Sequence, residues 1–143
     1  MRKGLYPIGR LDKDSRGALL GSNNGLLCYK HSHPKYKHKK SYEFWISASA
    51  SNKSISRWRN GVYVNEQLTK PAIVEILKRE QGKTLLKIVL SEGRNRQIRR
   101  FAAKLGQKVI DLNRVAIATI KLDSLKEGSW RELDISEWEH LLK

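Results

Sequence analysis

The chain has 143 residues, which is the length of one ordinary domain and too short for two sizeable ones. Lysine and arginine number 29 against 14 for aspartate and glutamate, so the formal net charge is +15. This excess excludes an ordinary neutral surface and favours a polyanionic partner, nucleic acid before an anionic membrane, because no apolar run approaches the ~20 residues of a spanning helix.

In chain order, the first half of the sequence predicts three short strands, at 17–20, 41–47 and 62–64. The middle one alternates in polarity, with Tyr42, Phe44 and Ile46 on one face, which is the period of a half-buried strand. A short helix is expected over 54–60, with Ser54 as its N-cap and Gly61 as its stop.

The second half predicts four further strands, at 72–77, 85–90, 108–112 and 116–122. The clearest helix covers 95–105, because Ile98, Phe101, Ala102 and Leu105 recur at helical spacing. A terminal helix is expected over 136–142, where Ser136 and Glu139 have capping-box spacing. Strands predominate and several connections are too short for crossover helices. We therefore expect an α+β fold with a mixed, mainly antiparallel sheet flanked by helices.

The cysteine and histidine content argues against a metal centre. Cys28 is the single cysteine, so neither an internal disulfide nor a cysteine zinc site can form, which suits a reducing cytoplasm. The spacing of His31, His33 and His38 differs from the i, i+4 pair of zinc enzymes, and Pro34 interrupts it. We predict no metal site.

Two aspartates, Asp12 and Asp14, stand out in a strongly basic neighbourhood. A carboxylate close to arginines can act as nucleophile or base on a substrate that the same cations hold. The alternative is that both are surface caps or ion-pair partners. Basic residues also cluster at 35–40 and 94–100, and the fold could join these clusters into one surface.

Several stretches carry a family resemblance. Gly9-Arg10-Leu11-Asp12, continuing to Asn23-Asn24-Gly25, resembles the signature of the RsuA-type pseudouridine synthases that act on ribosomal RNA. Lys40-Ser41-Tyr42-Glu43 is similar to the Lys-x-Tyr segment of that family. Residues 92–100, Glu-Gly-Arg-Asn-Arg-Gln-Ile-Arg-Arg, are nearly identical to its third motif, and 114–117 and 128–133 extend the likeness.

The resemblance implies an enzyme that isomerises a uridine within RNA to pseudouridine, breaking the glycosidic bond, turning the base and rejoining it through carbon. It implies no metal and no organic cofactor. The expected partner is ribosomal RNA, with the large subunit favoured, and the expected location is the cytoplasm. We expect a monomer.

The resemblance also implies roles for individual residues. Asp12 matches the catalytic aspartate, which attacks or deprotonates the nucleoside, and Arg99 matches the arginine that pairs with it. Tyr42 matches the ring that stacks on the flipped uracil and assists proton removal at C5. Arg10 matches an arginine that takes part in moving the base out of the helical stack. The remaining expected RNA-binding residues are Lys40, Arg94, Arg96 and Arg100, as phosphate contacts, and Ile98, as an apolar wall of the pocket.

The sequence departs from the family at two places. Gly21 stands inside the strand that follows the aspartate, where it removes a packing side chain. Relatives also carry an Asn-Lys-Pro segment, and many carry a small S4-type RNA-binding domain, ahead of the aspartate motif. We therefore expect a single catalytic domain over 1–143, without an S4 domain, that is either truncated at its start or lacks N-terminal strands. The competing hypothesis is a non-catalytic RNA-binding relative of the same fold.

Overall fold

The structure of the chain is a computed structural model that describes residues 4–25, 38–64, 66–93 and 96–141. The strands in these ranges are β1 (Tyr6–Ile8), β2 (Arg16–Gly17), β3 (Leu20–Ser22), β4 (Lys40–Ile46), β5 (Tyr63–Val64), β6 (Gln67–Leu68), β7 (Ile73–Glu80), β8 (Lys83–Leu90), β9 (Val109–Ile117) and β10 (Ile120–Lys121). The helices are α2 (Asn52–Asn60), α3 (Gln97–Lys104) and α4 (Ile135–Leu141).

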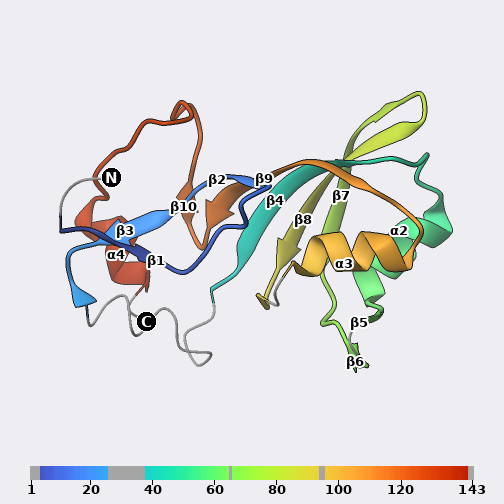
Figure 1. Ribbon diagram of the computed structural model, residues 1–143, viewed down its shortest axis with the longest axis horizontal. Helices are drawn as coiled ribbons and strands as arrows, with labels where there is room; N and C mark the ends of the chain where they lie inside the picture. The colour runs from blue at the N-terminus through green and yellow to red at the C-terminus, as the bar shows by residue number, and fades with distance from the viewer. Residues whose placement is uncertain (1–3, 26–37, 65, 94–95, 142–143) are drawn as a thin grey trace.

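One main sheet organises the described chain, with its strands in the order β10-β9-β4-β8-β7. Neighbours along this path are antiparallel, whereas β2 pairs parallel to β9. β1 pairs with β3, and β5 pairs with β6, each antiparallel. Figure 1 shows α2 and α3 over one face of the sheet, and β1, β3, β10 and α4 gathered at the other end of the molecule. The predicted α+β class with a mainly antiparallel sheet is confirmed.

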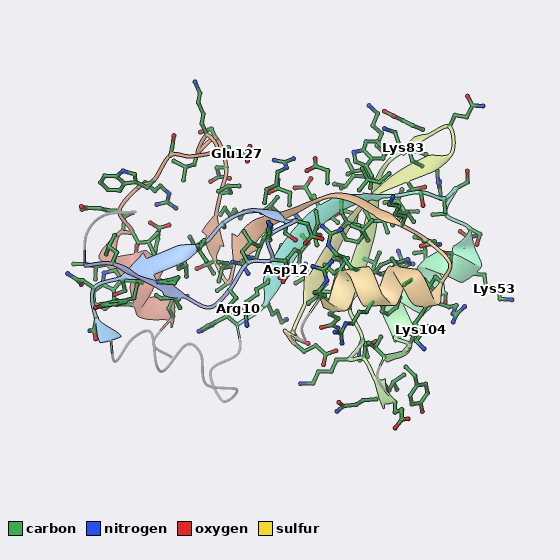
Figure 2. All side chains as sticks on the ribbon, viewed as in Figure 1. Arg10, Asp12, Lys53, Lys83, Lys104 and Glu127 are labelled. Atoms are coloured by element: carbon green, nitrogen blue, oxygen red, sulfur yellow. The ribbon has the colours of Figure 1, made fainter. Side chains whose placement is uncertain are left out.

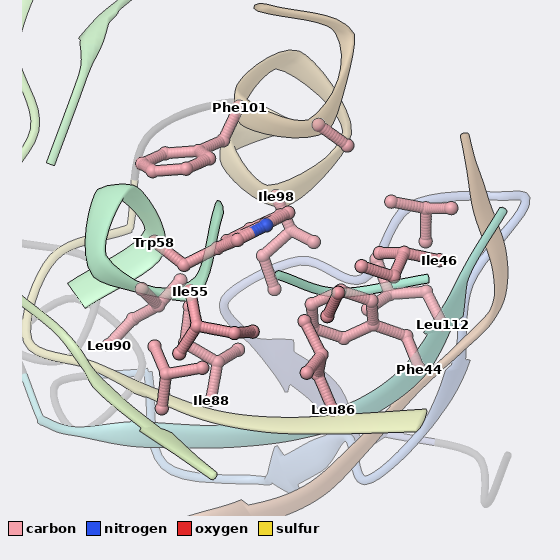
Figure 3. Packing of buried hydrophobic residues seen from close by; sticks show 14 of the residues in the cluster. Phe44, Ile46, Ile55, Trp58, Leu86, Ile88, Leu90, Ile98, Phe101 and Leu112 are labelled. Carbon is pink, nitrogen blue, oxygen red and sulfur yellow. The ribbon is translucent and has the colours of Figure 1, made fainter. Parts of the chain in front are cut away.

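The core lies between the sheet and the two helices α2 and α3 (Figure 3). The residues of β8 alternate between the core and the other face of the sheet, and its even-numbered positions are buried. Trp58 of α2 stacks on Phe101 of α3 with ring centroids 4.3 Å apart, and Phe44 of β4 lies 5.6 Å from Trp58. This packing fixes α3 on the sheet and thereby fixes where the arginines at the start of α3 lie.

The helices follow the predicted periodicity, with corrections at their ends. Ser51, not Ser54, caps α2, because the Ser51 hydroxyl accepts a hydrogen bond from the Ser54 backbone N–H at 3.1 Å. Gly61 ends α2 as predicted. α4 is capped by Asp134 and Glu137 instead of Ser136 and Glu139, since the Asp134 backbone N–H donates to Glu137 at 3.0 Å.

Two strand predictions were wrong in their boundaries. The single strand expected at 17–20 is divided into β2 and β3, because Gly17 has a φ of 118° and turns the chain against β9. The two strands expected at 108–112 and 116–122 are the continuous β9 followed by the short β10. Leu112, Arg114 and Ala116 are all buried along β9, so the polar residues between the two predicted runs do not interrupt it.

Candidate functional site

The candidate site is built around residues 10–18, which lie between β1 and β3, include the short strand β2, and are called the Asp12 loop. The loop contains a turn, because the Ser15 backbone N–H donates to the Asp12 carbonyl at 3.0 Å. Figure 2 shows Asp12 in the middle of the molecule, near the start of α3 and between the two ends of the main sheet. The loop therefore lies beside the third family-like motif, although Asp14 and Arg96, which pair across the site, are 82 positions apart in the sequence.

Arg96, the N-cap of α3, contacts both aspartates of the loop. Its guanidinium donates two hydrogen bonds to the Asp14 carboxylate, at 2.9 and 2.8 Å. The same group lies 3.9 Å from Asp12 Oδ2. A bidentate contact of this kind fixes orientation as well as charge, so Arg96 ties the loop to the helix.

Arg99, in the first turn of α3, also contacts Asp14. Its Nη2 donates to the Asp14 carbonyl at 2.7 Å. Its Nε lies 3.3 Å from Asp14 Oδ2 but is buried and makes no hydrogen bond with the described residues. The expected pair between Arg99 and Asp12 is not formed, because the turn at Asp12 presents Asp14 to the first turn of α3.

The charges of the site separate the two aspartates. Hydrogen bonds from Arg96, helped by the charge of Arg99, lower the pKa of Asp14 to about 2. Asp14 is therefore a fixed anion whose oxygens are occupied by arginine. The Asp12 side chain is 31% exposed, and the Arg96 guanidinium lies 3.9 Å from its Oδ2. The Asp14 side chain is more exposed, at 48%, but its oxygens are held by arginine, so Asp12 is the carboxylate with room for a further partner.

Arg96 holds its position in an uncommon backbone conformation. Its φ and ψ are 51° and 35°, in the left-handed region, and its side chain makes no capping hydrogen bond to α3. For a residue with a Cβ this conformation costs about 1 kcal/mol or more. Strain of this kind is concentrated at functional sites, where the surrounding contacts, here the bidentate bond to Asp14, hold the residue in place.

Strand β9 holds the loop from its other side. Arg16 forms an ion pair with Asp111, and Gly17 lies directly opposite Arg114 in the parallel pairing of β2 with β9. The Arg114 guanidinium donates to the carbonyls of Ala18 and Arg10, at 2.8 and 3.1 Å. The family-like run at 114–117 included Arg114, but no role was predicted for it, since an arginine is expected at the surface and no local pattern marks a buried one.

A second missed residue, Glu92, orders the approach to α3. It is buried, and its carboxylate accepts from the Gln97 side chain at 2.9 Å and from the Lys70 backbone N–H at 2.8 Å. Glu92 and Gln97 both belong to the motif at 92–100, so the resemblance marked these positions without showing that their role is structural.

Three other predicted residues lie around the loop and the strand next to it. Arg10 is exposed at the start of the Asp12 loop. Tyr42 is half-buried on β4, where its register partner on β9 is Arg114 and its ring packs against the core. Lys40 begins β4, and its Nζ lies beside Gly93.

The remaining predicted residues are more scattered. Ile98 is 4% exposed and packs in the core, where the helical period places it on the inner face of α3 with Phe101, and its role as an apolar wall stays a prediction. Arg100 lines an open groove of about 450 Å³ between α3 and the β5–β6 hairpin, together with Lys104 and Glu66. Arg94 lies outside the described residues.

Within the described ranges, no three His, Cys, Asp or Glu side chains come together as a metal site. His38 contacts the Leu141 carbonyl at 3.1 Å, and His31 and His33 are outside those ranges. The described helices include none with the length and apolarity needed to cross a membrane.

Comparison with known proteins identifies the family. A sequence model described as RNA pseudouridylate synthase matches residues 2–104, which include the Asp12 loop, Tyr42 and Arg99. The chain belongs to this family. A solved pseudouridylate synthase superposes on it with a TM-score of 0.86 at 32% identity, over 96% of this chain and 60% of the other. The RsuA-type resemblance of the motifs is thereby confirmed at the level of family and fold.

Curated pseudouridine synthases match along almost the whole chain. An uncharacterised RNA pseudouridine synthase of Aquifex aeolicus (strain VF5) is 37% identical over 139 residues, which are 97% of this chain and 56% of the relative. Ribosomal large subunit pseudouridine synthase B of Bacillus subtilis (strain 168) is 35% identical over 139 residues, 96% of this chain and 57% of the relative. The chain thus spans less than two thirds of the length of these relatives.

Proposed function

We propose that this protein isomerises a uridine within RNA to pseudouridine, with Asp12 as the catalytic residue. The observation that carries the proposal is the difference in arginine contacts between the two aspartates. Arg96 and Arg99 occupy Asp14, whereas Asp12 keeps a partly exposed carboxylate in the same cationic surroundings. A carboxylate that arginine does not occupy, next to phosphate-binding groups, is what attack on an RNA nucleoside requires.

The chemistry needs little beyond such a site. The bond between ribose C1′ and uracil N1 breaks, the base turns, and C5 bonds to C1′. The proton on C5 leaves and N1 takes up a proton, so the reaction is a redox-neutral isomerisation. Asp12 acts on the nucleoside as nucleophile or base, and Tyr42, half-buried on β4, stacks on the displaced uracil and assists proton removal.

The target base must first leave the helical stack, which costs a few kcal/mol. Arg10, exposed at the loop start, is the residue we assign to that step, because a guanidinium stacks on bases and contacts phosphate. Lys40, Arg96 and Arg100 are assigned to the RNA backbone. The net charge of +15 supplies the long-range attraction that brings RNA to this surface.

We infer that the substrate is ribosomal RNA, and we favour the large-subunit RNA. The support is the name of the Bacillus subtilis relative, which is 35% identical to this chain over the region that contains the proposed site. The groove beside Arg100 and Lys104 gives the RNA a second basic contact beyond the Asp12 loop.

One observation favours a second candidate, a non-catalytic RNA-binding protein of the same family. Arg99, expected to pair with the catalytic aspartate, contacts Asp14 instead. If RNA binding did not bring Arg99 Nε to Asp12 or to the substrate, the basic surface would remain without a working site.

The test measures tritium release from C5 of labelled uridine in ribosomal RNA transcripts of both subunits. Release by the wild-type chain and none by a folded Asp12→Asn variant that still binds the RNA is the expected result. Equal release by both proteins would remove Asp12 from the mechanism. RNA binding with a steep salt dependence, but no release by either protein, would establish the non-catalytic alternative.

A further inference from the structure

We propose that Arg114 is a positioning residue for catalysis, which holds the Asp12 loop in its reactive geometry through backbone contacts. The inference rests on the proposed function of Asp12 and adds a residue that touches neither RNA nor the reacting atoms. Three features carry it: the burial of Arg114, the targets of its guanidinium, and the way the loop backbone fits against it.

Arg114 is only 3% exposed, which is unusual for an arginine. Its Nε donates to the Ala18 carbonyl at 2.8 Å, and its Nη1 donates to the Arg10 carbonyl at 3.1 Å. These two carbonyls are at the two ends of the loop, one on each side of Asp12. A single guanidinium therefore fixes the distance between the two ends of the loop that carries Asp12.

No carboxylate pairs with Arg114 among the described residues. Burying a cation without a counter-ion is costly unless its donors are satisfied, so the backbone carbonyls compensate for lost water. The planar fork of arginine spans two acceptors at a fixed geometry, which the flexible point charge of lysine does not do. An arginine kept here for packing alone would be replaceable by an apolar residue of similar length.

The backbone of the same residue grips the loop as well. The Ala18 N–H donates to the Arg114 carbonyl at 2.8 Å. Gly17 has a φ of 118°, and a Cβ added there would lie 2.2 Å from the Arg114 carbonyl oxygen. The chain thus passes Arg114 at a distance that only glycine permits, and side chain and main chain hold the loop together.

Arg114 also links the loop to the other proposed catalytic group. In the antiparallel pairing of β4 with β9, the register partner of Arg114 is Tyr42. The Asp12 loop and the strand that carries Tyr42 therefore both contact β9 at position 114. Because a misplacement of about 1 Å can cost about 10²-fold in rate, losing the Arg114 contacts to the loop should lower kcat.

The test compares Arg114→Met and Arg114→Lys with a control of the same contact type, Arg59→Met. Arg59, an exposed residue of α2, donates Nε and Nη2 to a backbone carbonyl, that of Val74 on β7, at 3.3 and 3.1 Å, and touches no residue of the Asp12 loop among these contacts. Each variant is assayed for tritium release with kcat and KM separated. Amide hydrogen exchange is measured for the peptide covering residues 10–18.

For Arg114→Met we expect kcat to fall about 10²-fold with KM within about threefold of wild type, and faster exchange in the loop peptide. Arg114→Lys should restore part of the rate, and Arg59→Met should change neither kcat nor the loop exchange. If Arg114→Met does not fold, the kcat and loop exchange of Arg114→Lys decide in its place.

Unchanged kcat and loop exchange in both Arg114 variants would overturn the proposal while leaving the proposed function intact. A rise in KM with kcat unchanged would also overturn it, by making Arg114 an RNA-binding residue. If the wild-type chain releases no tritium, the proposed function fails, and the exchange of the loop peptide still decides whether Arg114 positions the loop.

Discussion

Two regions of the molecule are stabilised by different interactions: the main sheet covered by α2 and α3, and the Asp12 loop. In the sheet, Phe44 and Leu86 are fully buried and Trp58 is 1% exposed, so apolar burial fixes their positions. In the loop, none of the residues 10–18 is buried, and arginines from α3 and β9 hold it through carbonyls and carboxylates. Stability should therefore reside mainly in the first region and catalytic geometry in the second.

The largest expected effect on stability breaks the sheet side of this comparison. Replacing Trp58 by alanine removes a ring that stacks on Phe101 and lies near Phe44, and should cost about 3–5 kcal/mol. That is a large share of the ~5–15 kcal/mol by which a domain is stable. Urea unfolding measures it, and an unchanged midpoint would show that this core does not carry the stability.

A pair of glycines tests the loop side. A Cβ at Gly17 would lie 2.2 Å from the Arg114 carbonyl oxygen, so Gly17→Ala should lower stability by about 1–3 kcal/mol and activity by about 10²-fold. A Cβ at Gly21 has its nearest contact 3.6 Å away, at the Tyr6 carbonyl, so Gly21→Ala should stay within about 0.5 kcal/mol of wild type.

Thermal or urea unfolding measures the stability of both glycine variants, and tritium release measures their activity. Equal effects at the two positions would mean that the close approach of β2 to β9 is unimportant. The sequence suggested that Gly21 removes a packing side chain from its strand. In the structure Gly21 is exposed on β3, and a Cβ there would meet nothing closer than 3.6 Å.

A smaller effect sharpens the electrostatic part of the comparison. The pKa of Asp14 is lowered from its ordinary 3.8 to about 2, chiefly by hydrogen bonds from Arg96. A lowered pKa in the folded state means that the Asp14 contacts stabilise the fold above about pH 4 and are lost as the pH falls toward 2.

The unfolding free energies of wild type and Asp14→Asn should therefore differ at pH 6 and converge between pH 4 and pH 2. Urea titrations across this range check the prediction. A difference that is constant with pH would show that the Asp14 carboxylate is not held by arginine in solution.

The smallest expected effects concern the groove beside α3. Arg100→Ala and Lys104→Ala should each weaken RNA binding modestly and reduce the slope of log affinity against log salt by about 1. The exposed Lys53 on α2, which does not line the groove, provides the control, and Figure 2 shows it at the same end of the molecule as Lys104. If Lys53→Ala reduced the salt slope as much as the groove variants do, the positive charges would attract RNA only through the net charge, and the groove would not be a specific contact.

Most of the fold could be predicted because apolar periodicity reports burial directly. The alternation in β4, the apolar run of β8 and the spacing of Ile98, Phe101 and Ala102 in α3 all predicted elements that the structure contains. Helix caps were misplaced by two or three residues, since Ser51 and Ser54 offer the same hydroxyl. A local pattern cannot choose between them.

The sequence predicted which residues belong to the candidate site, but not which contacts they make. The motifs named Asp12 and Arg99, but which aspartate each arginine contacts depends on a turn and on a helix start that are distant in sequence. The resemblance included Arg114 but gave it no role, since its burial arises from the parallel approach of β2 to β9. Contacts between polar side chains and backbone carbonyls leave no periodic signal in a sequence.

The most direct test of this account compares the two aspartates in one assay. Tritium release at saturating RNA should fall by more than about 10³-fold in Asp12→Asn, because the reacting group is removed. Asp14→Asn, which loses only the arginine contacts of the loop, should keep a measurable rate within about 10²-fold of wild type. Abolished release in Asp14→Asn with release retained in Asp12→Asn would contradict the assignment of Asp12 as the catalytic residue.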